Sequence, residues 1–483
     1  MSNPVKNIQP TALWGHFADL NAVPRPSKKE ERVIAFMKNF GESLGLKTLV
    51  DEVGNVIIYK PGTPGYEDHT PVILQGHIDM VHQKNNDVDF DFDTQGIDMY
   101  IDGDWVKAKG TTLGADNGIG VAAIMALLSA KDIPHPPLEA LFTIDEETGM
   151  TGAAALQPGL LEGKILLNLD SEDDSEITIG CAGGIDVTVK KSYSAEAIPS
   201  DHSGYILTVK GLTGGHSGMD IHRGRGNANK LLNRLLWTVN RKTEIHIHRI
   251  IGGGLRNAIP REASAQIWIK NSDIEQFQKI IEAEKSDLLK EYKTTDPNLV
   301  IVLEEQNIGS EVLKESDQSG LLNSIYACPN GIYRMSPDVD NLVQTSNNLA
   351  HVVVEDGHIL IENLTRSAVD SEKMDLAHAI QSCFELMGGE VTLTGSYPGW
   401  APDPKAKING VLAAAFEEHY GQKPAILACH AGLECGIIKK AYPDVDMISF
   451  GPNIRGAHSP DEKVQISSVA KFWELLKKVL KDL

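Results

Sequence analysis

The sequence predicts an α/β domain with a mainly parallel sheet and helices on both faces, interrupted by an α+β domain. Short apolar runs such as 72–75 and 164–169 alternate with helix-like segments, which is typical of buried parallel strands and their crossover helices. Residues 187–396 instead show apolar and polar residues in alternation, as half-exposed strands do. We therefore expect residues 1–186 and 397–483 to form one discontinuous domain, and residues 187–396 to form a second.

The elements of the first domain follow from periodicity. Residues 11–45 predict helices, because "TALWGHFADL" and "SKKEERVIAFMKNFGESLG" carry apolar residues at helical spacing, with Ser27 as an N-cap of the second. A further helix is expected at 118–130, capped by Asn117. Buried strands are expected at 72–75, 138–144, 164–169 and 445–450.

The second domain shows a pattern that occurs twice. "GYILTVKGL" and "REASAQIWIK" predict half-exposed strands on either side of a helix at 227–239. A similar set recurs in "NLVIVLEE", "SGLLNSIYA", "HVVVEDGHILIENL" and "SEKMDLAHAIQSCFELM". We therefore expect an α+β domain of two related halves.

Composition excludes several classes of protein. The 483 residues carry a net charge of −21, which argues against partners such as nucleic acid or anionic membrane surfaces. No basic start followed by an apolar core marks a signal peptide, and the apolar stretch at 119–130 is too short to span a bilayer. Five cysteines without a C-x-x-C pair argue against a disulfide framework. We expect a cytoplasmic protein.

Acidic and imidazole side chains follow several of the predicted strands. His77 and Asp79 end the first, and because they are two residues apart they point to the same side of an extended chain. Any one of them alone is more simply a solvated loop residue. The pattern repeats, however, and the carboxyl ends of parallel strands meet at one edge of a sheet, where ligands bind. The other residues expected at this edge are Asp116, in a Gly-flanked turn before a helix, and Glu146, Glu147, Asp170 and His458.

These residue types indicate a metal site. Uncompensated carboxylates would repel one another, and bound dications remove that conflict. Imidazole with carboxylate suits zinc, or less specifically cobalt or manganese. If five of these seven residues are ligands, they exceed the number that one catalytic zinc takes from protein. We therefore expect two divalent ions that share Asp116 as a bridging carboxylate. No H-E-x-x-H motif or four-cysteine site offers a mononuclear alternative.

Motifs along nearly the whole chain resemble the co-catalytic dinuclear metallopeptidases of clan MH, which include aminoacylases, glutamate carboxypeptidases and carnosinases. The amino-acid sequences of these motifs are most similar to those of the bacterial aminoacyl-histidine dipeptidases, also called cytosolic non-specific dipeptidases. The resemblance implies a zinc-dependent dipeptidase for small substrates with a free C-terminal carboxylate, of broad specificity that includes Xaa-His dipeptides such as β-Ala-His. The motifs are "GHIDMV", "TTLGADNG", "DEETG", "LDSED", "GGHSG", "NAIPRE", "HAGLECG" and "GPNIRGAHSPDE".

The resemblance also implies roles at the metal site. Glu146 would be the general base toward a metal-bridged water and would pass the proton to the leaving amine. Asp79 would orient His77 through its second ring nitrogen. Sequence alone does not decide which residue of the Glu146–Glu147 pair is the base. The implied ligands are His77 and Asp170 for one ion and Glu147 and His458 for the other, with Asp116 between them.

The second domain would act as a lid over the substrate. His216 in "GGHSG" would stabilise the oxyanion, and Asn257 in "RNAIP" would lie near the substrate. Arg366 in "NLTRSAVDS" would bind the substrate's α-carboxylate, which a guanidinium matches with two hydrogen bonds. His430 and Glu434 in "CHAGLECG" are candidate pocket residues.

Other functions remain open from the sequence. An N-acyl amino acid deacylase or a tripeptide aminopeptidase of the same clan would keep the metals and differ in its pocket. A binding protein that has lost catalysis is a third class, against which the presence of Glu146 argues. For assembly, the resemblance favours a homodimer, and the long lid favours His216 acting within its own chain.

Overall fold

The computed structural model describes residues 3–198 and 200–483, which form two compact units. The first comprises Met1–Gly180, Ala401–Ala428 and Leu433–Leu483, and the second comprises Cys181–Trp400 and Cys429–Gly432. These divisions differ by a few residues from those expected at 186/187 and 396/397. The reason lies in strand pairing, because β9 (Gly183–Ser192) pairs along its length with β20 (His358–Ser367) of the second unit.

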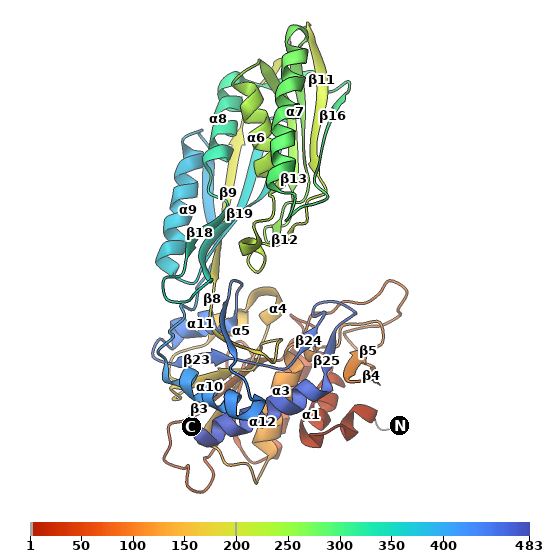
Figure 1. Cartoon of the computed structure of the whole chain (residues 1–483). Helices are drawn as coiled ribbons and strands as arrows, with labels where there is room; N and C mark the ends of the chain where they lie inside the picture. The colour runs from red at the N-terminus through yellow and green to blue at the C-terminus, as the bar shows by residue number, and fades with distance from the viewer. Residues whose placement is uncertain (1–2, 199) are drawn as a thin grey trace. The chain divides into compact units, whose positions relative to one another are not determined.

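The first unit is built on an eight-stranded mixed sheet (Figure 1). Its strands in spatial order are β1 (Lys47–Val50), β2 (Val56–Lys60), β6 (Leu138–Thr143), β3 (Val72–His77), β7 (Ile165–Asn168), β23 (Asp446–Ser449), β8 (Glu176–Cys181) and β22 (Ala425–Cys429). The four central strands from β6 to β23 run parallel, and these are the four strands expected from the sequence. Antiparallel neighbours flank them on both sides.

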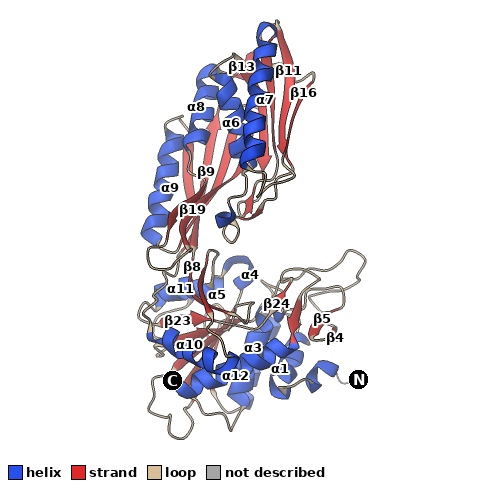
Figure 2. Ribbon diagram, in the orientation of Figure 1, coloured by secondary structure: helices blue, strands red, loops and turns tan. Residues whose placement is uncertain are grey.

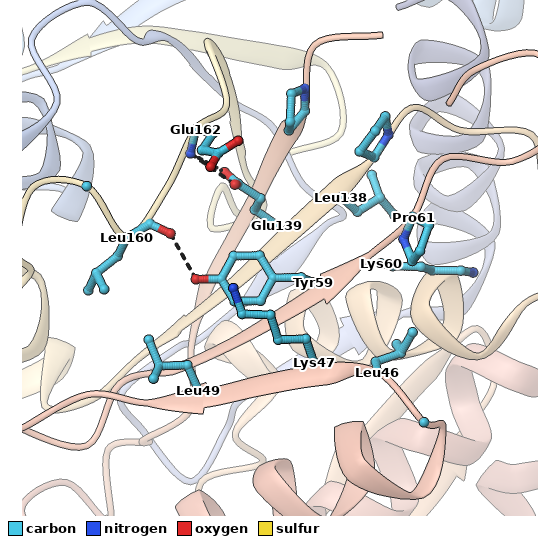
Figure 3. Close-up of a pocket in the computed structure, with 14 residues that line it drawn as sticks. Leu46, Lys47, Leu49, Tyr59, Lys60, Pro61, Leu138, Glu139, Leu160 and Glu162 are labelled. Atoms are coloured by element: carbon cyan, nitrogen blue, oxygen red, sulfur yellow. Dashed lines mark hydrogen bonds between the residues drawn. The ribbon is translucent and has the colours of Figure 1, made fainter. Parts of the chain in front are cut away.

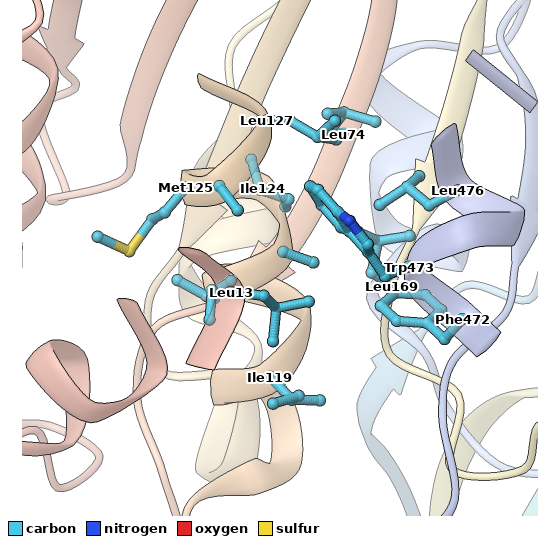
Figure 4. Packing of buried hydrophobic residues seen from close by; sticks show 14 of the residues in the cluster. Leu13, Leu74, Ile119, Ile124, Met125, Leu127, Leu169, Phe472, Trp473 and Leu476 are labelled. Carbon is cyan, nitrogen blue, oxygen red and sulfur yellow. The ribbon is translucent and has the colours of Figure 1, made fainter. Parts of the chain in front are cut away.

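Helices cover both faces of this sheet. Leu74 of β3 packs into a core with Phe472 and Trp473 and with side chains of α3 (Figure 4). The next residue of β3, Gln75, points to the opposite face, where it donates a hydrogen bond to Glu434. The predicted fold class is therefore confirmed. The helices are α1 (Thr11–Asn21), α2 (Glu31–Ser43), α3 (Ala115–Ser129), α4 (Glu146–Gly149), α5 (Thr151–Ala155), α10 (Lys407–Tyr420), α11 (Glu434–Ala441) and α12 (Ile466–Asp482).

Two predicted helix caps are wrong. Ser27 lies outside α2 and donates its hydroxyl to the carbonyl of Met80, so it caps no helix. Asn117 has non-helical backbone angles directly before the regular turns of α3, but its side chain donates to the carbonyl of Leu169 and its Oδ1 atom accepts no hydrogen bond from the described residues. Both polar side chains are used for tertiary contacts that local sequence does not reveal.

A small antiparallel sheet lies beside the main one in the first unit. It consists of β24 (Ile454–Arg455), β25 (Lys463–Gln465), β5 (Trp105–Ala108) and β4 (Met99–Asp102). The pairing of β25 with β5 joins the last part of the chain to the segment before α3. The loops after β24 and before α3 both contribute to the site described below.

The second unit is a nine-stranded antiparallel sheet with helices along one face (Figure 2). Its main path is β16 (Val300–Glu305), β11 (His202–Lys210), β15 (Ala263–Lys270), β13 (Ile245–Gly253), β19 (Val343–Glu355), β20, β9 and β21 (Glu390–Tyr397), and β18 (Gly331–Met335) also pairs with β19. Two short ribbons pair β10 (Ala195–Ala197) with β17 (Glu311–Leu313) and β12 (Gly215–His216) with β14 (Ala258–Ile259). The helices are α6 (Ala228–Asn240), α7 (Ile274–Glu291), α8 (Glu315–Ala327) and α9 (Asp370–Glu385).

The face of this sheet that carries the helices is apolar. Leu207 of β11 and Ile267 of β15 are fully buried, and they belong to one core with Leu235 of α6 and Phe277 of α7. The intervening strand residues lie on the other face, as the alternating sequence pattern predicts. Among the described residues, no helix in either unit combines the length and apolar character needed to cross a bilayer.

Candidate functional site

Three neighbouring parallel strands of the first unit end in polar side chains. His77 is the last residue of β3, and Asp79 follows two residues later. Glu146 and Glu147 open the short helix α4, directly after β6. Asp170 follows β7. Because these strands are adjacent and parallel, their carboxyl ends bring the five side chains to one edge of the sheet.

Asp116 lies between two histidines at this edge. Its Oδ1 atom is 3.2 Å from Nε2 of His77, and its Oδ2 atom is 3.3 Å from Nε2 of His458. Asp170 Oδ1 also faces His77 Nε2, at 3.5 Å, and Glu147 Oε2 faces His458 Nε2, at 3.0 Å. These contacts define two groups of potential metal ligands that share the Asp116 carboxylate, and together the groups comprise His77, Asp116, Glu147, Asp170 and His458. We call these five residues the carboxylate cluster.

The carboxylate cluster fits divalent ions. Within each group the ligand atoms lie within 4.8 Å of one another. Glu147 Oε1 and Asp170 Oδ1 are buried and accept no hydrogen bond from the described residues. Burial raises the pKa of Asp170 to about 7, and hydrogen bonds to Asp116 and Glu147 raise the pKa of His458 to about 11. The protein alone therefore favours added protons here, and bound cations would supply the same compensating charge.

Asp79 ties two of the strand ends together. Its carboxylate accepts hydrogen bonds from the backbone N–H groups of Glu146 and Glu147, at 3.1 and 3.3 Å. The same carboxylate faces Nδ1 of His77 at 3.3 Å. Burial would raise the pKa of Asp79, but its contact with His77 outweighs burial and lowers it. Asp79 is thus placed to hold the His77 ring with Nε2 toward the carboxylate cluster.

Glu146 and Glu147 differ in their contacts with His458. His458 forms its ion pairs with Glu147 and Asp116, and no ion pair among the described residues involves Glu146. Burial, opposed by His77 but reinforced by neighbouring carboxylates, raises the pKa of Glu146 well above its ordinary value. His77, Glu146 and Glu147 also each offer a potential ligand atom within 4.8 Å of the other two, so the geometry alone allows either glutamate to bind a metal.

The sequence did not identify Glu462 as a functional residue. Its buried carboxylate accepts four backbone hydrogen bonds, from Leu113 and Gly114 on Oε2 and from Ala115 and Asp116 on Oε1. It therefore fixes the backbone that carries Asp116 at the start of α3. In the sequence it stands four residues after His458, at the end of the motif "GPNIRGAHSPDE", and neither observation specifies its partner.

Arg25 is a second buried support that the sequence did not reveal. Its guanidinium donates to the carbonyls of Asp79, at 2.8 Å, and Gly114, at 2.6 Å. Burial lowers its pKa to about 10, with Glu462 foremost among the carboxylates that oppose the shift. Gly114 has a positive φ of 68°, and a Cβ there would lie 2.5 Å from Arg25 Nη2. Arg25 and Gly114 thus require each other at the turn before Asp116.

Glu434 lies in the first unit, beneath the strands that carry the site. Its Oε2 atom accepts hydrogen bonds from Gln75 and Thr143, both at 2.6 Å. Burial raises its pKa to about 8, which favours a neutral carboxyl group. Glu434 is therefore part of the polar support under β3 and β6.

His216 and Asn257 meet in the short ribbon of the second unit. The Asn257 carbonyl accepts a hydrogen bond from Ser217 N, and the Asn257 side chain is exposed. His216 Nδ1 accepts hydrogen bonds from the backbone N–H groups of Gly218 and Met219. Because Nδ1 is an acceptor, the proton of the neutral ring belongs on Nε2. Burial, with Arg366 nearby, lowers the pKa of His216 and favours this neutral donor.

Arg366 of β20 is a buried cation without a carboxylate partner. Its side chain donates to the hydroxyl of Tyr397 at 2.9 Å, and its Nε atom lies 3.5 Å from Ser217 Oγ. Among the described residues no carboxylate forms an ion pair with it, and only 4% of Arg366 is exposed. A buried charge without an opposite charge is costly, so this guanidinium is suited to an anionic ligand.

His430 joins this region of the second unit. Its Nε2 atom lies 2.8 Å from Ser346 Oγ, and the residue is buried. Burial, with the positive charge of Arg366 nearby, lowers the pKa of His430 to about 3, so the ring is neutral. The second unit therefore assembles Arg366, His216, Asn257 and His430, which we call the Arg366 group.

A surface cavity of the first unit lies apart from the carboxylate cluster. It has a volume of about 600 Å³ and is lined by residues of β1, β2 and β6 (Figure 3). Two of its polar side chains are engaged internally, because Tyr59 donates to the Leu160 carbonyl and Glu139 accepts from the backbone of Glu162. The cavity contains no residue of the carboxylate cluster, so the functional interpretation rests on the cluster.

The chain is similar to known peptidases over almost its full length. It is 41% identical over 479 residues to the cytosol non-specific dipeptidase of Escherichia coli (strain K12), covering 99% of both chains. The crystal structure of aminoacylhistidine dipeptidase from Vibrio alginolyticus superposes with a TM-score of 0.95 at 43% identity, covering 99% of this chain and 98% of that one.

More distant structures share the fold alone. The aminopeptidase PepT from Bacillus cereus has a TM-score of 0.57 at 17% identity and covers 98% of this chain and 99% of its own.

Residues 73–482 match peptidase family M20/M25/M40, and this range contains every residue of the carboxylate cluster. On the strength of this match and of the two similar dipeptidases, the chain belongs to the metal-dependent peptidase family M20/M25/M40.

Proposed function

We propose that this protein hydrolyses dipeptides with a free C-terminal carboxylate at a site that holds two divalent ions, with zinc as the preferred metal. The observation that carries the proposal is the position of Asp116, whose two oxygens face different histidines. His77 and Asp170 would hold one ion, and Glu147 and His458 the other. Bound there, the ions would polarise the scissile carbonyl and favour ionisation of the attacking water.

Glu146 is the residue we assign to proton transfer. Its backbone is fixed by Asp79, and its carboxylate makes no ion pair among the described residues. In the proposed reaction this carboxylate accepts a proton from the attacking water and returns it to the leaving amine. The water oxygen first forms the new C–O bond, and the C–N bond breaks once the leaving amine has received the proton, so the products are two amino acids.

The Arg366 group would bind the substrate from the second unit, which we propose acts as a lid. The Arg366 guanidinium, braced by Tyr397, would pair with the substrate's α-carboxylate. His216 would donate from Nε2 to the carbonyl oxygen as negative charge develops on it. Asn257 and the neutral His430 would border the same substrate pocket.

Broad specificity, including Xaa-His substrates such as β-Ala-His, is the form of this proposal that the relatives support. The Escherichia coli relative is named a non-specific dipeptidase and the Vibrio alginolyticus relative an aminoacylhistidine dipeptidase. We also infer a cytoplasmic location, in keeping with the name of the Escherichia coli relative.

A panel of substrates tests the proposed function. Metal-reconstituted protein should hydrolyse free dipeptides and should turn over C-amidated dipeptides, N-acyl amino acids and tripeptides poorly. Preferred hydrolysis of N-acyl amino acids would indicate a deacylase instead. Preferred hydrolysis of tripeptides would indicate a tripeptide aminopeptidase.

For assembly we propose a homodimer in which His216 acts within its own chain. Mixing His216→Ala protein with Glu146→Gln protein tests this arrangement. If His216 acted across subunits, hybrid dimers would regain one complete site and activity would rise. We expect no recovery in a sample shown to exchange subunits.

A further inference from the structure

The second unit contains another group of potential metal ligands, which shares no residue with the carboxylate cluster. His202 is the first residue of β11, and His246 is the second residue of β13. Glu244 immediately precedes β13. Both strands pair with β15, so the two histidines come from strands on opposite sides of the same neighbour.

The three side chains converge. One ligand atom from each of His202, Glu244 and His246 lies within 4.8 Å of the other two. The two imidazole rings meet edge to face, with centroids 5.2 Å apart and an interplanar angle of 66°. Glu244 Oε1 lies 3.3 Å from Nε2 of His246. Two imidazoles and a carboxylate form a ligand set that suits zinc.

Three of the four ring nitrogens at this site are buried and have no hydrogen-bond partner among the described residues. The side chain of His202 is only 3% exposed, and neither of its ring nitrogens makes a hydrogen bond with the part of the chain that the structure describes. Nε2 of His246 is buried in the same way. Asp201 Oδ1 lies 3.0 Å from His202 Nδ1, which is an electrostatic contact without hydrogen-bond geometry.

An aromatic contact alone does not account for this arrangement. Edge-to-face packing stabilises the two rings but leaves their buried nitrogens unsatisfied, and a buried polar atom without a partner is costly. A metal ion would satisfy one nitrogen of each ring together with a Glu244 oxygen. Asp201 would then orient His202 through its remaining nitrogen, as carboxylates commonly do for metal-bound histidines.

We propose that His202, Glu244 and His246 bind a divalent transition-metal ion, with zinc as the favoured metal. The ion links β11 to β13 across β15 and stabilises this end of the nine-stranded sheet. The site is structural, because none of its residues belongs to the carboxylate cluster or to the Arg366 group. It is independent of the proposed hydrolysis.

A zinc titration tests this site without reference to activity. The full-length protein is stripped of metal and titrated with zinc against a chromophoric chelator at neutral pH. His246→Gln should bind one zinc equivalent fewer than the unmodified protein, and Glu244→Gln should bind that equivalent more weakly. His378→Asn is the matched control, because His378 is exposed on α9 and outside this group; it should bind zinc like the unmodified protein.

Thermal unfolding gives a second measurement. Zinc should raise the melting temperature of His378→Asn protein more than that of His246→Gln protein, because binding to the folded state stabilises it. Glu244 is largely exposed, so Glu244→Gln should fold even if a histidine variant does not. Zinc stoichiometry, affinity and melting shifts in His246→Gln and Glu244→Gln that match the control would overturn the proposal.

Discussion

The carboxylate cluster and the Arg366 group differ in the sign of their uncompensated charge. In the first unit, carboxylates gather around His77 and His458, and Glu147 Oε1 and Asp170 Oδ1 accept no hydrogen bond from the described residues. In the second unit, the buried Arg366 donates to a tyrosine hydroxyl and forms no ion pair with a carboxylate of the described residues. The first region is therefore suited to cations, and the second is suited to an anionic group.

The two regions also differ in how the backbone supports them. The carboxylate cluster stands at the ends of adjacent parallel strands, and Glu462 and Arg25 fix its turns through backbone hydrogen bonds. His216 instead lies on a two-residue strand, where neighbouring N–H groups hold its ring. Changes in the first unit should therefore affect metal binding, and changes in the second should affect substrate binding.

Of the changes considered, metal removal should have the largest effect on activity. Exhaustive chelation should abolish dipeptide hydrolysis, and zinc, cobalt or manganese should restore it, because the carboxylate cluster needs compensating cations. His77→Ala and Asp170→Ala should bind less metal than the unmodified protein. Activity assays paired with elemental analysis test this, and full turnover by verified metal-free protein would contradict it.

Glu146→Gln should separate chemistry from metal binding. The change keeps the size of the side chain but removes the proton acceptor, so kcat should fall by at least about a hundredfold. Metal content should stay near that of the unmodified protein, because Glu147 rather than Glu146 pairs with His458. Glu417→Gln, at an exposed position of α10, is the control. Near-normal kcat in Glu146→Gln would show that another group is the base.

Arg366→Ala should weaken substrate binding and leave metal content unchanged. A hydrogen bond to a charged group contributes about 1.5–3 kcal/mol, which corresponds to roughly 10- to 100-fold in kcat/KM. The variant should also lose its preference for free over amidated dipeptides. The control is Arg334→Ala, since Arg334 is an exposed residue. If Arg366→Ala kept the full preference for the free carboxylate, the carboxylate would be bound elsewhere.

Glu462→Gln should have the smallest effect of the series. The change weakens the acceptor that holds the backbone of Asp116, so metal affinity should fall by about tenfold, as for other groups that support metal ligands. Glu474→Gln, at an exposed position of α12, is the control. Metal titration measures the difference, and equal affinity in both variants would show that Glu462 does not position Asp116.

The sequence predicted those parts of the site that follow from local pattern. Apolar runs ending in His77, Glu146 and Asp170 identified the strand ends, because parallel strands place those ends at one edge. Glu462 and Arg25 gave no comparable signal. Glu462 acts on the backbone of Asp116 across 346 positions of sequence, and such a contact becomes visible only when the chain is folded.

The same limit explains why the helix cap predicted at Asn117 is wrong. Asparagine is a common residue at helix N-caps. The side chain of Asn117 nevertheless donates a hydrogen bond to the Leu169 carbonyl, because α3 packs closely against the segment that follows β7. The division between the units also depends on pairing, since β9 joins β20 as soon as the chain leaves β8. Local sequence propensity does not predict when a residue will make a long-range hydrogen bond or strand pairing in place of a local one.

Anomalous X-ray diffraction from zinc-loaded crystals, collected at the zinc absorption edge, tests the shared-carboxylate centre most directly. The account predicts two peaks on either side of the Asp116 carboxylate, one beside His77 and Asp170 and the other beside Glu147 and His458. A single peak, or two peaks that do not share Asp116, would contradict it.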